Sequence, residues 1–359
     1  MKLLYITPKI SNSGGVARIL SVKLNYLVEV CNFDVVLLVT NDPERRMFYE
    51  FNEKISINYF SKSNNLGYLK DYRDFIISNV NTQKPNVVLV LDNGLKGGLI
   101  PIWIKGLPII YERHSSKLEL KYTSGSVLKK IRGFFTYNLI NNLARKFSLI
   151  VVLNESMKNE WKHRNIEVIP NPLWFDPKSL KMVEKKKKVI FVGRQTKQKG
   201  VDLLLEIWKK LHPKNPEWEM DIYGEPTSEF NLQSNDKLNL NVKSPTKNIH
   251  EIYSDASLLF LTSRNEGFGM VLIEAMAYKI PCVAFNCPVG PSHIINEGEN
   301  GFLIDAFNID EFVTKAGKLM KDQTMNYSMG KNAQISVEKY QLKNVMEQWI
   351  SIFNSITSA

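Results

Sequence analysis

The sequence has few cysteines: Cys31, Cys282 and Cys287 are the full set among 359 residues. Their number and uneven spacing exclude a disulfide framework and a paired CxxC zinc site, so we interpret all three as structural residues. The chain also lacks a run of about 18 uncharged apolar residues, which a membrane-spanning helix would require. Its first residues do not follow the pattern of a secretory signal peptide. We therefore expect a cytoplasmic protein.

Low-complexity tracts are absent as well. Hydrophobic residues make up 44% of the chain and charged residues 23%, which is typical of a packed globular protein and excludes a disordered one. A chain of this length exceeds the usual size of one domain, so we expect two domains of roughly 150 to 200 residues with a cleft between them.

Acidic residues are scarce in the first half of the chain. Residues 1–180 hold 25 Lys and Arg against 15 Asp and Glu, a net charge of +10, whereas residues 181–359 hold 22 against 21. The excess is greatest in residues 117–146, where basic residues flank aromatic ones at near-helical spacing. We interpret this segment as a contact for an anionic membrane surface or for the acceptor of a reaction. An ordinary solvated helix with one core-facing stripe explains the same pattern. The residues concerned are Lys129, Lys130, Arg132, Phe134 and Phe135.

Short runs rich in Val, Ile and Leu recur between segments of helical period. Such strands indicate buried parallel sheets with helices on both faces, and the series occurs twice. The predicted fold class is therefore α/β, with two Rossmann-like, doubly wound domains. The expected strands are 2–7, 34–40, 86–92, 108–113 and 148–154, and then 188–193, 219–224, 238–243, 256–263 and 280–285.

A segment rich in proline and lysine separates the two series. It contains Pro170, Pro172 and Pro177, followed by four lysines at 185–188. Proline removes backbone donors and like charges repel, so we predict a linker at 172–187 whose lysines are solvated. The predicted domains are residues 1–171 and 188–342.

Glycines follow the first expected strand of each domain. Gly14 and Gly15 precede a helix, where missing Cβ atoms would let an anion approach backbone amides, and Arg18 could add charge. A plain strand-to-helix turn accounts for the same glycine pair. The dinucleotide motif GxGxxG is absent, which argues against a dehydrogenase.

Two cations leave the first strand of the second domain together, in FVGRQTKQKGVDLLLEIW. Gly193 precedes Arg194, and Lys199 precedes Gly200 and a helix. A forked guanidinium and a point-charge ammonium beside a helix start suit a diphosphate. Simple surface exposure is the alternative.

The stretch SRNEGFGMVLIEAMA places two glutamates around a glycine-rich helix start. Glu266 and Glu274 suit vicinal hydroxyls, of a sugar and of a ribose, and the glycines could receive an anion. Helix-dipole stabilisation, worth about 0.3 to 1 kcal/mol, would explain Glu274 alone. We assign the intervening loop to the same binding site. Its residues are Gly267, Phe268, Gly269 and Met270.

His114 follows the expected strand PIIYER, at its carboxyl end. Ligands of parallel sheets bind beyond this end of the strands, which favours a functional histidine over a structural one. Glu112 alternates to the same strand face and is interpreted as its support.

Together these motifs resemble the retaining glycosyltransferases of family 4, which have the GT-B fold and include bacterial surface-polysaccharide and lipopolysaccharide enzymes. The resemblance covers nearly the whole chain in order and is strongest from 188 to 304. It rests on SGG at 13–15, ERH at 112–114, IPNP at 169–172, GR at 193–194, KG at 199–200, EGFGMVLIEAMA at 266–277 and NCPVGPSHIINEGENGFLI at 286–304.

The resemblance implies a role for each matching residue. Arg194 and Lys199 would bind the donor diphosphate, Glu266 the transferred sugar and Glu274 the ribose, while His114 would point toward the donor sugar. Family members generally need no metal, and this chain has no DxD pair to hold one. In the GT-B fold the C-terminal helix, here 343–359, crosses back onto the first domain. The chain departs from the family pattern at two places. It has PNP at 170–172 where the family commonly has PNG, and NCPVGPSH at 286–293 in a loop where the family often has an acidic residue, so the identity of the donor stays open.

We therefore expect a metal-independent, retaining hexosyltransferase that moves a hexose or N-acetylhexosamine from a nucleoside diphosphate sugar, a UDP-sugar by resemblance. The acceptor would be a glycan or a polyprenyl-diphosphate-linked glycan in bacterial surface-polysaccharide biosynthesis, with peripheral attachment to the anionic inner membrane. A GT-B sugar-nucleotide epimerase and a synthase acting on a soluble glycan are the alternatives. A nucleic-acid binder fits the pI of about 9.3 but not the paired sheets and glutamates.

Overall fold

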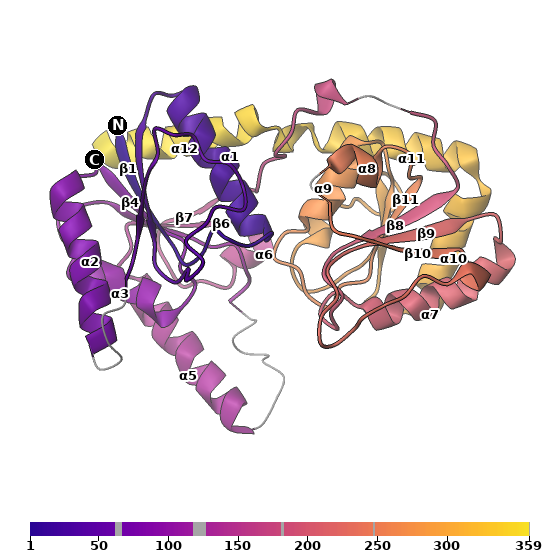
Figure 1. The fold of residues 1–359 in the computed structure, drawn as a ribbon, viewed down its shortest axis with the longest axis horizontal. Helices are drawn as coiled ribbons and strands as arrows, with labels where there is room; N and C mark the ends of the chain where they lie inside the picture. Colours follow the sequence, from indigo (N-terminus) through magenta and orange to yellow (C-terminus); the bar gives the residue numbers. More distant parts are fainter. Residues whose placement is uncertain (62–66, 118–126, 181–182, 247, 359) are drawn as a thin grey trace. The chain divides into compact units, whose positions relative to one another are not determined.

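The computed structural model describes residues 1–61, 67–117, 127–180, 183–246 and 248–358, with backbone alone for 127–135 and 178. The chain divides into two compact units, Met1–Trp174 with Lys343–Ala359 and Phe175–Leu342. Each unit contains a parallel sheet with helices packed on it (Figure 1). The predicted fold class is confirmed.

The sheet of the first unit has the order β3-β2-β1-β4-β5-β6-β7, and all its strand pairs are parallel. The order reverses between β1 and β4, which makes this the switch point where ligands of open sheets bind. Its strands are β1 (Lys2–Thr7), β2 (Asp34–Val39), β3 (Ser56–Tyr59), β4 (Val87–Val90), β5 (Ile109–Glu112), β6 (Leu149–Val152) and β7 (Ile166–Val168). Its helices are α1 (Gly15–Glu29), α2 (Tyr68–Gln83), α3 (Leu95–Trp103), α5 (Val127–Ala144), α6 (Glu155–Lys158) and α12 (Leu342–Ser358).

The last helix, α12, drawn in yellow in Figure 1, belongs to the first unit over almost its whole length. It buries Val345, Met346, Trp349 and Phe353, which recur at helical spacing. The Phe353 ring lies 6.4 Å from that of Phe33. After the last helix of the second unit, the chain thus returns to the first unit and adds α12 to its core.

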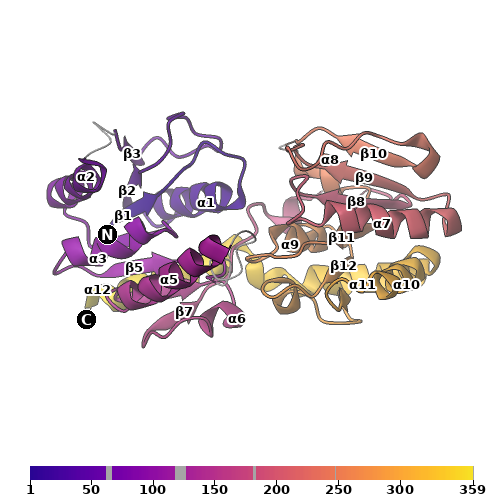
Figure 2. The same cartoon turned by 90° about the horizontal axis from the view of Figure 1, so that it is seen from below.

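The sheet of the second unit has the order β10-β9-β8-β11-β12-β13, again with parallel pairs only. Figure 2 shows this order from β10 through β9, β8 and β11 to β12. The switch point lies between β8 and β11. The strands are β8 (Lys188–Val192), β9 (Glu219–Tyr223), β10 (Leu240–Lys243), β11 (Leu258–Leu261), β12 (Cys282–Phe285) and β13 (Gly301–Ile304). The helices are α7 (Val201–Leu211), α8 (Ile249–Tyr253), α9 (Met270–Ala277), α10 (Ile309–Lys321) and α11 (Gln323–Ser336).

Three strands escaped prediction: β3, β7 and β13. The first two are edge strands of the first sheet and have no fully buried residue, so they lack the continuous apolar run that marks the interior strands. β13 is the edge of the second sheet and begins with Gly301. For β3 and β7 the apolar signal therefore reports burial rather than strand formation itself, whereas β13 is largely buried and was missed for its short length.

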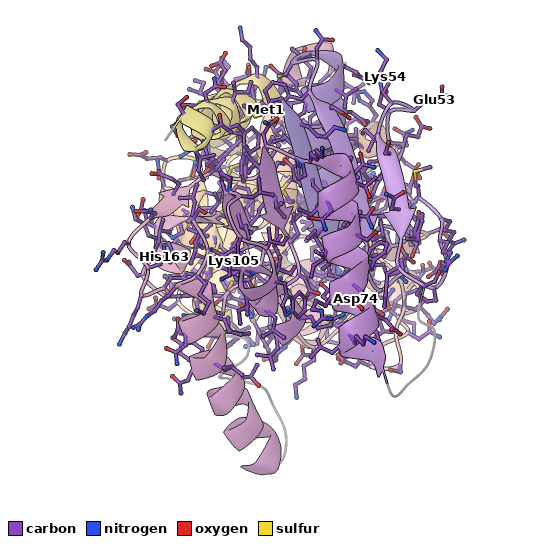
Figure 3. The ribbon with its side chains drawn as sticks, turned by 90° about the vertical axis from the view of Figure 1, so that its left-hand side faces the viewer. Met1, Glu53, Lys54, Asp74, Lys105 and His163 are labelled. Atoms are coloured by element: carbon purple, nitrogen blue, oxygen red, sulfur yellow. The ribbon has the colours of Figure 1, made fainter. Side chains whose placement is uncertain are left out.

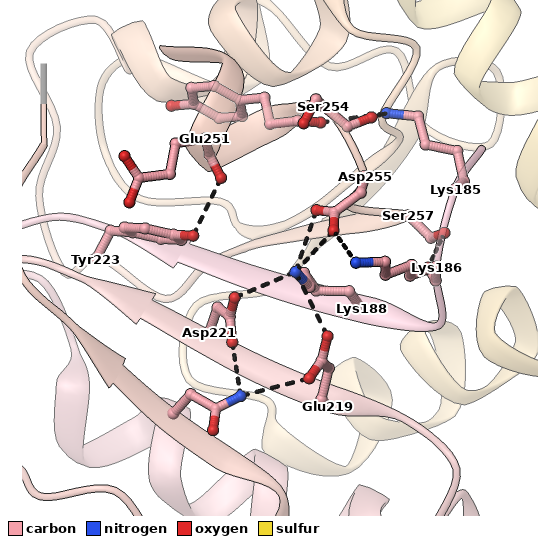
Figure 4. Close-up of polar contacts among 12 residues, drawn as sticks. Lys185, Lys186, Lys188, Glu219, Asp221, Tyr223, Glu251, Ser254, Asp255 and Ser257 are labelled. Carbon is pink, nitrogen blue, oxygen red and sulfur yellow. Dashed lines mark hydrogen bonds and ion pairs between the residues drawn. The ribbon is translucent and has the colours of Figure 1, made fainter. Parts of the chain in front are cut away.

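The prediction that the lysines at 185–188 are solvated is wrong for two of them. Lys188 begins β8, and its ammonium lies 3.0 Å from Asp255 Oδ2 with the side chain 10% exposed. Lys185 donates to the backbone carbonyl of Ser254 at 2.9 Å. Burial alone would lower the pKa of Lys188, but hydrogen bonding to Asp255 and nearby carboxylates raise it. These two lysines anchor the entry to the second sheet (Figure 4).

The basic segment 117–146 contains α5, which extends from the first unit in Figure 3. The side chains of Lys129, Lys130, Arg132, Phe134 and Phe135 lie outside the described residues, so their predicted role stays a prediction.

Lys117, at the start of the segment, is buried and unavailable to a membrane surface. Its ammonium donates to Asn141 Oδ1 and lies 4.2 Å from the Trp161 ring centre. Burial lowers the pKa of Lys117 to about 8. Among the helices that the structure describes, none is long and apolar enough to cross a bilayer.

Candidate functional site

The loop after β8 carries Arg194 and Lys199, the two predicted phosphate-binding cations, at the switch point of the second sheet, and Lys197 between them. Arg194 is exposed and forms no ion pair with any residue in the described part of the chain, and the Lys199 side chain is 23% exposed. Gly200 closes the loop with φ +69°, and a Cβ there would lie 1.9 Å from the carbonyl oxygen of Thr262. Only glycine fits this approach, which brings the loops after β8 and β11 together.

Arg264 fastens the same two loops to each other. Its guanidinium contacts both carboxylate oxygens of Asp202 in α7, at 2.7 and 2.8 Å, and donates to the Lys197 carbonyl at 2.6 Å. The hydrogen bond from Arg264 lowers the pKa of Asp202. Sequence reasoning missed this residue, although it stands in the SRNEG stretch. Its partner is 62 positions away, so no local pattern pointed to it.

The structure brings Lys199 and Glu266 into direct contact. Lys199 Nζ lies 2.7 Å from Glu266 Oε1, and the Ser263 hydroxyl donates to the same oxygen at 2.6 Å. The Glu266 side chain is 9% exposed, whereas that of Lys199 is more than twice as open. A carboxylate and an ammonium thus share the carboxyl ends of β8 and β11, as expected for a site that holds both hydroxyls and phosphate.

Glu274 is the fifth residue of α9 and is buried, at 3% exposure. The Tyr253 hydroxyl donates to its Oε2 at 2.8 Å, and the Tyr253 ring stacks on Tyr278 with ring centres 5.7 Å apart. The helix-dipole explanation requires an acid in the first turn, and α9 has none there. The carboxylate is instead held in one orientation by an aromatic hydroxyl.

The glycine-rich loop between these glutamates contains both partly exposed residues and one side chain that belongs to the core. Gly269 is the N-cap of α9 with φ +97°, and Gly267 and Met270 are half-buried. Phe268 is 4% exposed, and its ring packs edge-on against Tyr340 at 5.5 Å. The Phe268 side chain is therefore part of the core, which leaves its backbone as the part that could contact a donor.

In the first unit, the predicted glycines stand at the start of α1. Gly14 is the N-cap, and its amide donates to Asn12 Oδ1 at 3.1 Å. A Cβ at Gly15 would meet no atom within 4 Å, so packing within the chain does not require glycine there. The Arg18 guanidinium lies over the Trp174 ring at 4.6 Å. The Arg18 guanidinium keeps its charge in this contact, so its part in an anion site stays a prediction.

His114 lies just beyond β5, with its side chain only 4% exposed. Its Nε2 is 3.0 Å from Glu112 Oε1, and the ammonium of Lys23 is 2.5 Å from the same oxygen. Burial alone would raise the pKa of Glu112, but Lys23 and His114 lower it to about 2. The imidazole is thus part of a buried polar cluster at the carboxyl end of the sheet.

Two sets of predicted residues are therefore assembled within their own units. Lys199 and Glu266 meet at the switch point of the second sheet, while Arg194 lies in the same loop as Lys199. Glu274, in the helix that follows β11, contacts Tyr253. His114 and Glu112 meet in the first unit. This chemistry suits binding of a phosphorylated polyol.

Comparison with known proteins is consistent with this chemistry. Residues 174–336 match the family model described as glycosyl transferases group 1. Over 98% of its length the chain is 26% identical to an uncharacterized glycosyltransferase of Haemophilus influenzae, and 28% identical to the amylovoran biosynthesis glycosyltransferase AmsD of Erwinia amylovora. Each alignment covers 99% of the relative.

The fold also has solved counterparts. The structure of Anabaena HepE in complex with UDP-glucose superposes with a TM-score of 0.76 at 17% identity, covering 99% of this chain and all of that one. Apart from its first residue, the family match lies in the unit that holds the two loops and both glutamates. The chain is a glycosyltransferase with the GT-B fold, and its second unit is a group 1 glycosyltransferase domain.

Proposed function

We propose that this enzyme transfers a hexose or N-acetylhexosamine, with retention of configuration, from a UDP-sugar to a glycan acceptor in bacterial surface-polysaccharide biosynthesis. The observation that carries the proposal is the contact of Lys199 with Glu266 at the switch point. Glu274 follows Glu266 in the same loop-to-helix stretch and accepts a hydrogen bond from Tyr253. The amylovoran biosynthesis relative supports the pathway class, and the HepE complex supports UDP.

The donor site is assigned from the charges of the second unit. Arg194 and Lys199 bind the diphosphate, because Arg194 follows the carboxyl end of β8 and Lys199 precedes the start of α7. Glu274 accepts the ribose hydroxyls, and Glu266 accepts hydroxyls of the transferred sugar. Without a donor, Lys199 and Glu266 form an ion pair with each other. When the donor binds, Lys199 turns to the diphosphate and Glu266 turns to the sugar hydroxyls.

The transfer step breaks the bond between the sugar's anomeric carbon and the diphosphate oxygen. A bond from the acceptor hydroxyl forms on the same face, and the hydroxyl proton passes to the departing phosphate oxygen. Negative charge grows on the diphosphate, where Arg194 and Lys199 stabilise it. We propose no metal and no protein nucleophile for this step.

For the acceptor we propose a polyprenyl-diphosphate-linked glycan, with the enzyme attached peripherally to the cytoplasmic face of the membrane. The support is the +10 charge of residues 1–180 and the basic aromatic segment. Binding to anionic vesicles tests it, with charge reversal at Lys129, Lys130 and Arg132 as the discriminating variant. Equal binding of wild type and variant, or none by either, would contradict membrane attachment.

A donor screen tests the reaction itself. Purified enzyme is incubated with each of several UDP-sugars and with GDP-mannose, and nucleotide release and thermal stabilisation are recorded. We expect one UDP-sugar to be hydrolysed and to raise the unfolding free energy by about 2.7 kcal/mol at 100 times its Kd. Stabilisation by GDP-mannose alone would contradict the UDP assignment. Formation of an epimer without acceptor would identify an epimerase instead.

A further inference from the structure

A buried chain of charged and aromatic side chains lies behind His114 in the first unit. The Lys23 ammonium and the His114 imidazole both contact Glu112 Oε1, and all three side chains are at most 4% exposed. On its other side, Lys23 Nζ lies 3.7 Å from the centre of the Trp349 ring. The cluster therefore connects α1, the end of β5 and α12 to one histidine.

These contacts determine which nitrogen of His114 carries a proton. Because the pKa of Glu112 is lowered to about 2, its carboxylate is ionised and can only accept hydrogen bonds. The contact at Glu112 Oε1 therefore requires a proton on His114 Nε2. His114 Nδ1 has no partner among the described residues, so in a neutral ring it holds the lone pair.

The Lys23–Glu112 pair is not explained by stability alone. Burying an ion pair costs desolvation free energy that apolar side chains of similar volume avoid, so such pairs contribute little net stability. The Trp349 ring offsets part of this cost for the ammonium through a cation–π contact. The specific consequence of the pair falls on His114, because only an ionised Glu112 fixes the tautomer and the direction of the ring.

We propose that Lys23 is a positioning residue, which with Glu112 holds His114 as the Nε2–H tautomer in one orientation, while Trp349 of the C-terminal helix keeps Lys23 in place. The tautomer is a property of the first unit and is independent of any substrate. Its consequence for turnover rests on the proposed function and on the role that the family resemblance implies for His114.

The direct test is the ring-nitrogen NMR spectrum of the full-length protein, labelled with ¹⁵N in its histidine rings. It is recorded without ligand at pH 8, above the ordinary histidine pKa of about 6.5. The His114 signals are identified by their loss in His114→Gln. We expect an amine-like Nε2 and an imine-like Nδ1. The opposite assignment in the wild-type protein would overturn the proposal without any other variant.

A substitution then tests the role of Lys23. In Lys23→Met, Glu112 loses the ammonium that holds its Oε1 in place, so the carboxylate no longer fixes the ring of His114 and its signals shift toward a mixture of the two tautomers. The matched control is Lys2→Met, which removes a more exposed lysine paired with Asp34 at 2.9 Å in the same sheet. It leaves the His114 signals unchanged. Unchanged His114 signals in a folded Lys23→Met protein would overturn the proposal.

Kinetics separates positioning from packing. With the donor found by the screen, Lys23→Met lowers kcat about 10- to 100-fold while the KM for the donor changes less than about 3-fold. Lys2→Met changes neither. If the wild-type protein transfers no sugar, the proposed function fails while the tautomer result stands. If the His114 signals change in Lys23→Met but its kcat stays within about 3-fold of the wild-type value, the role of Lys23 in turnover is overturned.

Discussion

The two ends of β8 carry lysines that do opposite things. At the amino end, Lys188 is surrounded by the carboxylates of Asp255, Asp221 and Glu219, all within 3.4 Å of its ammonium. Just beyond the carboxyl end, Lys199 has one carboxylate partner in the described part of the chain, Glu266, and a more open side chain. Both residues are cations next to the same strand, and they differ in their partners, their exposure and the end of the strand at which they lie.

The difference shows how a folded chain separates structural from functional charge. A lysine that forms ion pairs with several carboxylates stabilises the fold, and its ammonium is not available to a ligand. A lysine with one carboxylate partner among the described residues, in the same loop as the exposed guanidinium of Arg194, can exchange that partner for a phosphate. Position at the carboxyl end of a parallel strand then decides which of the two a ligand meets.

The largest expected effect is on turnover, at the carboxyl end. Lys199→Ala removes a cation that stabilises the leaving diphosphate. The resulting fall in kcat/KM should correspond to a loss of about 2 to 4 kcal/mol in transition-state stabilisation. The matched control is Lys197→Ala, an exposed lysine in the same loop. Steady-state kinetics with the UDP-sugar found by the screen measures both. Equal losses in the two variants would erase the distinction between a functional and a merely nearby charge.

At the amino end the effect should appear in stability instead. Lys188→Met leaves Asp221, with its side chain 2% exposed, without a cation, so the free energy of unfolding should fall by about 3 kcal/mol. Lys187→Met, which removes an exposed partner of Glu217, should cost less than about 1 kcal/mol. Urea denaturation of both proteins checks this. A Lys188→Met protein as stable as wild type would show that its carboxylate partners do not depend on it.

Glu274→Ala sharpens the comparison within the donor site. We expect UDP to bind about 2 kcal/mol more weakly, because a hydrogen bond from ribose to a charged acceptor is lost, while kcat with saturating donor changes little. Glu251→Ala, on the nearby helix α8, is the control. Calorimetric titration with UDP gives both affinities. Unchanged UDP affinity in Glu274→Ala would remove this residue from the site.

The smallest expected effect is none at all. Chelation with EDTA should leave the wild-type rate unchanged, because the proposed step uses side-chain cations where a metal-dependent transferase uses Mg²⁺ or Mn²⁺. Loss of activity that added Mg²⁺ restores would show that Arg194 and Lys199 do not suffice for the leaving group.

The donor-side residues could be proposed from the sequence because their signal is local, and their roles stay a prediction. Gly193 to Gly200 and Glu266 to Glu274 are short stretches in which residue types and spacing already suggest a diphosphate and hydroxyls. The strands that are buried on both faces were predictable for the same reason. Edge strands such as β3 and β7 were not, because half-exposed strands need no apolar run.

The remaining features depend on contacts between distant positions. Arg264 meets Asp202 across 62 positions, and Lys23 meets Glu112 across 89. The solvation of Lys188 was mispredicted because its carboxylates come from β9 and the turn before β11. Charge runs in a sequence therefore say little until the fold reveals which carboxylates face them.

The most direct test of the donor site is hydrogen exchange of the full-length protein with and without UDP. UDP should slow exchange of backbone amides in residues 193–200 and 263–274, and leave residues 185–188 unchanged. Protection of both loops would support a nucleotide site at the carboxyl ends of β8 and β11. Protection confined to other segments, at concentrations of UDP that stabilise the protein, would contradict the central claim.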